Sequence, residues 1–283
     1  MEVLYATDGS HGAQAAGRML SHFPLPPGSR INVVTVATGE DETKARVTLD
    51  AALALLEASA AETEGAVVHG HVVQEILRAA DDVRADLLVV GASGHSAIAR
   101  FLLGTVTERV ARHARCPVLV VRNDPGPLRA VLLAVDHTAG ANRAAAWLRE
   151  FPIPEGCAVR IMTVARRLDE LIRVRTMQVM PAFTDEQLRE HAERVSAEAQ
   201  EHLDALSEEF EAAGKRASTW VQFGGDPAEG ILDAARKEDA GLIVLGDEPH
   251  SALERYFMGH VTEPVLRHAG CAVLIVRDHK PAA

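Results

Sequence analysis

The sequence predicts an α/β protein made of two tandem, doubly wound domains, each with a five-stranded parallel sheet of the Rossmann-like type. The chain has 283 residues, which suits two domains at about 150 residues each. Short runs of Val, Ile and Leu alternate with longer segments of helical period, as in parallel sheets with crossover helices. The chain also repeats itself. We therefore expect two copies of one fold.

The repeat is clearest at its beginning and its end. The segment VLYATDGSHGAQAAGRML from Val3 returns from Val131 as VLLAVDHTAGANRAAAWL, at a shift of about 128 residues. The segment from Gly91 to the end of the first copy returns from Gly246 at a shift of about 155 residues, with about 18 of 32 positions identical. The difference between the shifts predicts about 27 additional residues in the second copy.

Five strands are predicted in the first copy, in order along the chain. They are expected near Val3–Thr7, Ile31–Ala37, Ala66–Gly70, Asp86–Gly91 and Val118–Arg122. Continuous apolar runs such as LLVV and PVLVV suit strands that are buried on both faces. Ligands of doubly wound sheets bind outside the carboxyl ends of the strands, where the strand order reverses. The loops after the first and fourth strands are therefore the candidate site.

The domain boundary is expected in the linker NDPGPLR, which contains two prolines and a glycine. The domains would then cover residues 1–124 and 129–283. The last strands of the copies, Val118–Arg122 and Val273–Arg277, are candidate sheet edges that can pair with one another. The tandem would then be an intramolecular pseudo-dimer. The sequence does not decide whether two such chains form a homodimer or which protein is the partner.

Composition excludes several functional classes. Lys and Arg number 29 against 40 Asp and Glu, a formal net charge of −11, which disfavours binding to nucleic acid or to anionic membranes. Three cysteines without a CxxC pair predict neither a disulfide framework nor a zinc site. No apolar run approaches the about 20 residues of a membrane span, and the chain starts directly with a strand rather than a signal peptide. We expect a cytoplasmic protein that holds any phosphate locally.

The loop after the fourth strand has the composition of a phosphate-binding loop. It reads GxxG and, nine residues later, GT, with these positions at Gly91, Gly94, Gly104 and Thr105. Glycines permit positive φ and close approach of an anion, and a helix start adds N–H donors and a favourable dipole. Thr105 and Glu108 match a capping box, so the helix should begin at Thr105. Alternatively, the glycines only permit a tight turn and Thr105 is a plain N-cap.

Asp8, at the end of the first strand, is a second candidate. An acidic residue there can accept hydrogen bonds from ribose hydroxyls or adenine amino groups. Alternatively, it forms an Asx turn or a helix cap before the first helix. Asp136 repeats it in the second copy, where His137 replaces Gly9.

Three segments together resemble the universal stress protein family: ATDGS from Ala6, the GxxG motif with nine residues to GT, and the CPVLVVR ending. The resemblance covers both copies. The glycine spacing is similar to the motif that distinguishes ATP-binding members of this family. The resemblance implies ATP with Mg²⁺ in the first copy, with the phosphates on the glycine loop and the adenosine near Asp8. The implied binding residues are Ala6, Asp8, Val36, Val90, Gly91, Gly94, Gly104, Thr105 and Val106.

The second copy has lost this motif. Asp247, Glu248, Pro249 and His260 replace Ala92, Ser93, Gly94 and Thr105. Proline lacks an N–H donor and carboxylates repel phosphate, and Pro264 removes a further donor from the next helix. We expect no ATP here. Alternatively, Asp247, Glu248 and His260 form a metal or catalytic cluster, or the carboxylates are simply solvated.

The additional segment of the second copy, from about Arg166 to about His191, contains the Met-rich sequence MQVMPAF and a cap-like Thr184 before a long amphipathic helix. Flexible Met side chains suit a lid or an adaptable contact surface, or they fill a groove on their own domain.

The sequence therefore predicts a stress-response, ATP-binding regulatory or sensor protein. No catalytic and no metal-ligating residue is predicted. The alternative is a slow ATPase or phosphotransferase that uses the same site. Against it, GASGHSAIARFLLGT has no lysine, and neither a Walker motif nor a base for phosphoryl transfer is evident. A scaffold without nucleotide is a third possibility.

Overall fold

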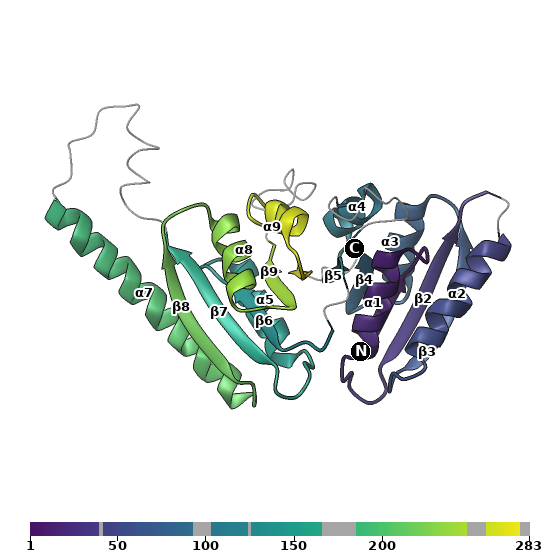
Figure 1. The fold of residues 1–283 in the computed structure, drawn as a ribbon, viewed down its shortest axis with the longest axis horizontal. Coiled ribbons are helices and arrows are strands. Elements are labelled where there is room, and N and C mark those ends of the chain that lie inside the picture. Colours follow the sequence, from purple (N-terminus) through teal and green to yellow (C-terminus); the bar gives the residue numbers. More distant parts are fainter. Residues whose placement is uncertain (40–41, 93–102, 124–125, 166–184, 248–258, 278–283) are drawn as a thin grey trace, which may run out of the picture.

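A computed structural model describes residues 1–39, 42–92, 103–123, 126–165, 185–247 and 259–277. They form one ten-stranded sheet with helices on both faces (Figure 1). The strand order is β3-β2-β1-β4-β5-β10-β9-β6-β7-β8. Each copy contributes five neighbouring strands in the equivalent order, parallel to one another. The predicted fold class, two tandem Rossmann-like domains, is confirmed.

The first copy alternates strand and helix throughout. Its elements are β1 (Glu2–Ala6), α1 (His11–Ser21), β2 (Arg30–Ala37), α2 (Glu42–Leu56), β3 (Glu62–His69), α3 (Val72–Asp82), β4 (Leu87–Gly91), α4 (Thr105–His113) and β5 (Val118–Val121). The expected start of the third strand, Ala66, was wrong, since β3 already begins at Glu62. Residues 62–65 are exposed, so they lack the apolar pattern of a buried strand, and their pairing with β2 defines the strand instead.

The second copy repeats this order with one longer helix. Its elements are β6 (Ala130–Ala134), α5 (Ala139–Glu150), β7 (Ala158–Ala165), α7 (Asp185–Ala212), β8 (Ala217–Phe223), α8 (Pro227–Lys237), β9 (Leu242–Gly246), α9 (Thr262–His268) and β10 (Ala272–Val276). The long helix expected after Thr184 is present as α7, with 28 residues. Thr184 and MQVMPAF lie outside the described residues. None of the described helices is both long and apolar enough to cross a membrane.

The sheet separates two hydrophobic cores. Helices α1, α2, α5 and α7 bury their apolar sides on one face, and α3, α4, α8 and α9 on the other. The cysteines belong to this packing, because Cys116 and Cys157 are buried and Cys271 is half-buried. Burial raises the pKa of Cys116 to about 12 and that of Cys271 to about 11, so both thiols are protonated at neutral pH.

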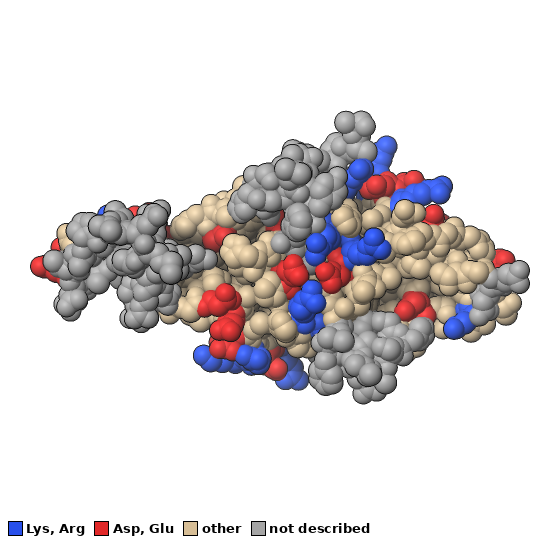
Figure 2. All heavy atoms as spheres, turned by 90° about the horizontal axis from the view of Figure 1, so that it is seen from above, with Lys and Arg blue, Asp and Glu red and all other residues tan. Residues whose placement is uncertain are grey.

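The copies meet through their last strands. β5 and β10 are antiparallel, with Val120 opposite Val273 and Val118 opposite Ile275. Each strand thereby covers the edge that the other would expose, and the two sheets become one. Seen from above, acidic and basic side chains gather side by side in the middle of the molecule, over this junction (Figure 2).

Candidate functional site

A cavity of about 360 Å³ lies in the first copy at the carboxyl ends of β1 and β4. The strand order of this copy reverses between these two strands, which is where doubly wound sheets bind ligands. Of the nine predicted binding residues, eight line the cavity, namely Ala6, Asp8, Val36, Val90, Gly91, Gly104, Thr105 and Val106. The ninth, Gly94, lies outside the described residues. The structure thus brings together residues that are up to 100 positions apart in the sequence.

A larger cleft, of about 580 Å³, lies at the opposite ends of the strands in the second copy. It is lined by the interdomain linker and by the carboxyl ends of α8 and α9, including Arg236 and His268, both of which are exposed. No strand-order reversal and no helix amino terminus faces this cleft among the described residues, so the smaller cavity is the better candidate site.

The loop between β1 and α1 holds Asp8 at the rim of the cavity. Its Oδ1 accepts a hydrogen bond from the Ser10 N–H at 2.9 Å, which is the Asx turn considered above. Ser10 is the N-cap of α1, because its Oγ accepts from the Ala13 N–H at 3.3 Å. Gly9 has a φ of 74°, which explains the glycine at this position. The Asx turn orients the Asp8 side chain, which also lines the cavity.

Gly91 is required by packing rather than by a positive φ. A Cβ at this position would lie 2.4 Å from the backbone nitrogen of Ala13, so only glycine lets α1 approach β4 this closely. Gly246 plays the same part in the second copy, where a Cβ would lie 2.1 Å from the Gly140 carbonyl oxygen. Neither Gly91 nor Gly104 has a positive φ, so that part of the predicted reason for these glycines was wrong.

Helix α4 begins at Thr105 as predicted, but the predicted capping box was wrong. The N-cap is Gly104, which offers no side chain, so Thr105 is the first helical residue. The Glu108 side chain reaches Arg112 and Arg267 instead of the helix start. The first helical hydrogen bond runs from the Glu108 N–H to the Gly104 oxygen at 2.9 Å. The N–H groups of the preceding turn therefore have no acceptor within the helix.

Two further hydrogen bonds attach this helix start to the sheet. The Gly104 N–H donates to the Ala92 oxygen at 2.8 Å, and the Thr107 hydroxyl donates to the Gly91 oxygen at 2.7 Å. The Gly104 N–H is thus already bonded within the protein, so Gly104 lines the cavity without offering this N–H to a ligand. Thr107 was not predicted, although it also lines the cavity. The repeat contains the signal for it, because Thr262 occupies the equivalent position and both residues are buried.

The chemistry of the cavity combines an apolar wall with a polar rim. Its apolar lining comes from Val34, Val36, Val72, Ile76 and Val90. Asp8 is the one charged residue among the described lining residues. An anion would therefore be held by the first-turn N–H groups and the dipole of α4 rather than by a basic side chain.

The equivalent cavity of the second copy is smaller, about 220 Å³. Asp136 repeats the turn of Asp8, since its Oδ1 accepts from the Thr138 N–H at 3.0 Å. The following helix, α9, begins at Thr262, two positions later than its counterpart. Pro264 has no N–H to donate to the His260 oxygen, which interrupts the helical bonds there. The Glu263 N–H still donates to the Gly259 oxygen at 3.0 Å, as its counterpart Glu108 donates to Gly104. His260 lines this cavity at the position where Thr105 lines that of the first copy.

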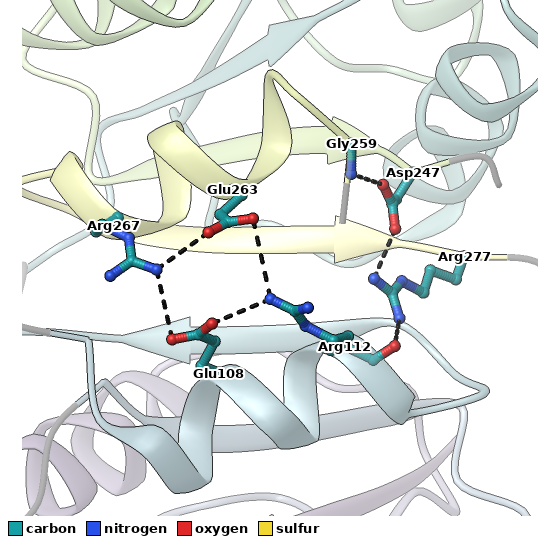
Figure 3. Close-up of polar contacts among 7 residues, drawn as sticks. All are labelled: Glu108, Arg112, Asp247, Gly259, Glu263, Arg267 and Arg277. Carbon is teal, nitrogen blue, oxygen red and sulfur yellow. Dashed lines mark hydrogen bonds and ion pairs between the residues drawn. The ribbon is translucent and has the colours of Figure 1, made fainter. Parts of the chain in front are cut away.

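Asp247 forms a buried ion pair, which neither predicted interpretation described. Its Oδ2 lies 2.6 Å from the Arg277 Nη2, and its Oδ1 accepts from the Gly259 N–H at 3.2 Å (Figure 3). Its carboxylate is neither solvated nor part of a group of three or more potential metal ligands among the described residues. Glu248 lies outside those residues. Repulsion of phosphate by a free Asp247 charge is therefore not the reason why this loop differs.

Arginines at the ends of the two last strands cross the junction. Arg277 donates to the Arg112 oxygen near the end of α4 (Figure 3). Arg122 donates to the oxygens of Leu266 and Arg267 near the end of α9, both at 3.2 Å. Each copy thus satisfies carbonyl groups at the carboxyl end of the other copy's helix, where positive charge is favourable. The sequence contained a signal for this contact, because an arginine follows the apolar run at the end of each copy.

A ring of alternating charges joins α4 to α9 beside these arginines (Figure 3). Arg112 lies 3.0 Å from Glu108 and 3.9 Å from Glu263, and Arg267 lies 3.1 Å from Glu263 and 3.5 Å from Glu108. Each side chain therefore has two oppositely charged neighbours. The ring connects the helix that begins at the cavity of the first copy with its equivalent in the second copy.

Comparison with known proteins identifies the family. The universal stress protein family model matches the chain twice, over residues 1–122 and 127–277. The chain belongs to the universal stress protein family. The two matches correspond to the two copies.

Curated relatives match less than half of the chain. The universal stress protein Slr1230 of Synechocystis is 33% identical over 121 residues, 43% of this chain and 42% of that protein. Sll1388 from the same organism is 36% identical over 90 residues, 32% of this chain and 58% of that protein. The matched segments thus span about half the length of these relatives.

Two solved structures match nearly the whole chain. A universal stress protein from Archaeoglobus fulgidus has a TM-score of 0.69 at 20% identity, with 99% of this chain and 98% of that chain covered. The functionally unknown protein PA1789 from Pseudomonas aeruginosa has a TM-score of 0.65 at 16% identity, with 98% and 92% covered. These similarities show the tandem fold.

Proposed function

We propose that this universal stress protein binds one ATP, together with Mg²⁺, in the cavity of its first copy and acts as a regulatory or sensor protein in the stress response. The observation that carries the proposal is the convergence of eight predicted residues on one cavity beside the start of α4. Its volume of about 360 Å³ lies within the roughly 300–1,000 Å³ of ligand pockets.

The two sides of the cavity suit the two ends of ATP. The first turn of α4, with Thr105 and Val106 at the cavity, offers N–H groups and a positive dipole end for the phosphates. The apolar wall suits the adenine ring, and the Asp8 carboxylate at the rim suits ribose hydroxyls. Mg²⁺ in proteins commonly combines one or two carboxylates with substrate phosphates. Asp8, the one carboxylate among the described lining residues, is assigned here to the ribose, so the phosphates would supply most of the ligands of Mg²⁺.

Binding rather than rapid phosphoryl transfer fits this lining. The described residues around the cavity include no Lys, Arg or His, whereas efficient phosphoryl transfer normally uses a basic side chain on the transferred phosphate. A slow ATPase would use the same cavity.

The second copy, in this proposal, binds no nucleotide and supports the first. Its cavity has about 220 Å³, its helix starts two positions later, and His260 stands at the cavity where the first copy has Thr105. The paired strands and the ring of charges make it the permanent partner of the first copy, so that the tandem is an intramolecular pseudo-dimer.

The repeat provides a matched test of the site. Asp8→Ala and Asp136→Ala each remove the Asx-turn hydrogen bond before a capped helix, and Asp136→Ala also removes a bond from the Thr138 hydroxyl, so it is a stringent structural control. Only Asp8→Ala should weaken ATP binding. Loss of a hydrogen bond to a charged group costs about 1.5–3 kcal/mol, so the affinity should fall roughly ten-fold to more than a hundred-fold.

Titration of both variants with ATP, followed by fluorescence or calorimetry, measures this difference. Circular dichroism establishes that both variants are folded. Equal affinities of Asp8→Ala and Asp136→Ala would place the nucleotide outside this cavity and refute the assignment.

A further inference from the structure

The ten-stranded sheet ends in two outer strands, β3 and β8, which differ in chemistry. β3 carries Glu62 and Glu64, and it also contains Gly65, a poor strand former. β8 has the sequence ASTWVQF, without any charged residue, glycine or proline. Thr, Trp, Val and Phe favour strand pairing, and Phe223 at its end is 46% exposed. β8 therefore lacks the charged residues and prolines that often protect an exposed edge strand.

The hydrogen bonds of β8 show which of its backbone groups point outward. The Arg216 oxygen accepts from Val159 of β7 at 2.8 Å, and the Gly224 N–H donates to Ala165 at the end of β7 at 2.9 Å. Alternate residues of a strand direct their N–H and C=O groups to the same side. The even-numbered residues of β8 thus face β7, and the odd-numbered ones, including Thr219 and Val221, face away from it. Among the described residues, no strand lies beyond them.

Helix α7 places negative charge beside this edge. It is the outermost helix on this side of the molecule and packs on β7 and β8 (Figure 1) through Leu203, Leu206 and Phe210. On one flank of this buried stripe, Glu209 pairs with Arg149 of α5, so this flank faces the interior of the copy. The opposite flank faces the outer side of β8.

Four exposed acidic residues follow one another along that outer flank: Glu186, Glu193, Asp204 and Glu211. Their spacings of 7, 11 and 7 residues correspond to about two, three and two helical turns, so they form one row. A strand added to β8 would lie next to this acidic row, with every second side chain on the same face of the sheet as α7.

We propose that the outer edge of β8 binds an extended segment of another protein that carries Lys or Arg at alternate positions. The segment pairs with the outward N–H and C=O groups of β8 as an eleventh strand, and its basic side chains contact the acidic row of α7. A second copy of the chain is a poorer occupant. Antiparallel pairing of β8 with itself would bring two acidic α7 helices together on one face of the sheet, in a chain of net charge −11.

The experiment uses a short peptide of alternating Lys and Val with blocked ends, labelled for fluorescence anisotropy, and a peptide of alternating Glu and Val as its control. The full-length protein should bind the Lys peptide and not the Glu peptide. Thr219→Pro removes one outward N–H group while the bonds to β7 stay intact, and it should weaken binding about ten-fold or more.

The matched control variant is Thr63→Pro on the other outer strand. The Glu62 N–H donates to Ser29, which precedes β2, at 3.1 Å, so Thr63 faces outward in the same way as Thr219. Thr63→Pro should leave the affinity for the Lys peptide unchanged. Asp204→Lys combined with Glu211→Lys tests the charge without altering the strand, and it should weaken binding of the Lys peptide.

Three results would overturn the proposal. Equal binding of the Lys peptide to the parent and to both the Thr219→Pro and the double Lys variants would show that it binds elsewhere. Slow amide exchange of Thr219 and Val221 in the free monomer would show that another segment of the same chain already covers the edge. A dimer that dissociates on Thr219→Pro substitution would identify a second copy as the occupant.

Discussion

The ion pair between Asp247 and Arg277 gives a prediction whose size follows from its burial. The two side chains are 7% and 12% exposed, and their charged atoms lie 2.6 Å apart. Asp247→Ala introduces the residue type that the first copy has at the equivalent position, Ala92. It leaves the Arg277 charge buried without a carboxylate and the Gly259 N–H without its acceptor. We expect a clear loss of stability.

Removal of one partner of a buried ion pair costs about 3–5 kcal/mol. Arg277 keeps its hydrogen bond to the Arg112 oxygen in this variant. Arg122 shows that a buried arginine at this junction can be held by helix carbonyl groups. We therefore expect the lower end, about 3 kcal/mol. At roughly 2–4 °C per kcal/mol, Tm should fall by about 6–12 °C.

Urea and thermal unfolding, followed by circular dichroism, measure this loss. The control is Glu263→Gln in the ring of charges, where the side chains of Glu263 and Arg267 are 36% and 40% exposed. Solvent screens such pairs, so the control should lose less than about 1 kcal/mol. A loss for Asp247→Ala no greater than that of the control would refute the reasoning.

Two further predictions concern packing and pH. Gly91→Ala and Gly246→Ala should each cost about 3 kcal/mol or more in unfolding experiments, because the added Cβ meets backbone atoms in both copies, whereas only Gly91→Ala should weaken ATP binding in titrations. Burial and the neighbouring His137 lower the pKa of His202, so the unfolded chain takes up its proton more readily than the folded protein. The free energy of unfolding should therefore fall as the pH drops below about 6.5, and His202→Gln should reduce this fall in urea titrations at about pH 7.5 and about pH 5.5.

The repeated pattern made the fold and the place of the site predictable. Buried parallel strands have continuous apolar sequences. Because the chain contains two copies, the sequence pattern of most elements could be recognised twice. β3 was located only in part because its exposed residues 62–65 have no apolar pattern. The convergence of the candidate residues on one cavity could be predicted because the loops after β1 and β4 must meet at one end of the sheet.

The details that sequence alone did not predict depend on contacts between distant residues. The sequence TVTE is compatible with a capping box, but the chain enters the helix one residue earlier, so Gly104 is the N-cap and Glu108 reaches the other copy. The sequence around Asp247 suggested a surface carboxylate. Its partner, Arg277, lies 30 positions later in the chain, so the ion pair could not be read from the local sequence. The glycine at position 91 suggested a positive φ and close approach of an anion, or a tight turn, whereas the close approach of α1 is what excludes a side chain there.

Calorimetric titration of the full-length protein with ATP in the presence of Mg²⁺ tests the central claim most directly. The cavity lined by Asp8, Gly91 and Thr105 predicts one site per chain, and the smaller cavity lined by Asp136 and His260 predicts no second site. One bound ATP that is lost in Asp8→Ala and kept in Asp136→Ala is the expected result. Two equivalent sites per chain, or no binding at millimolar ATP, would contradict the account.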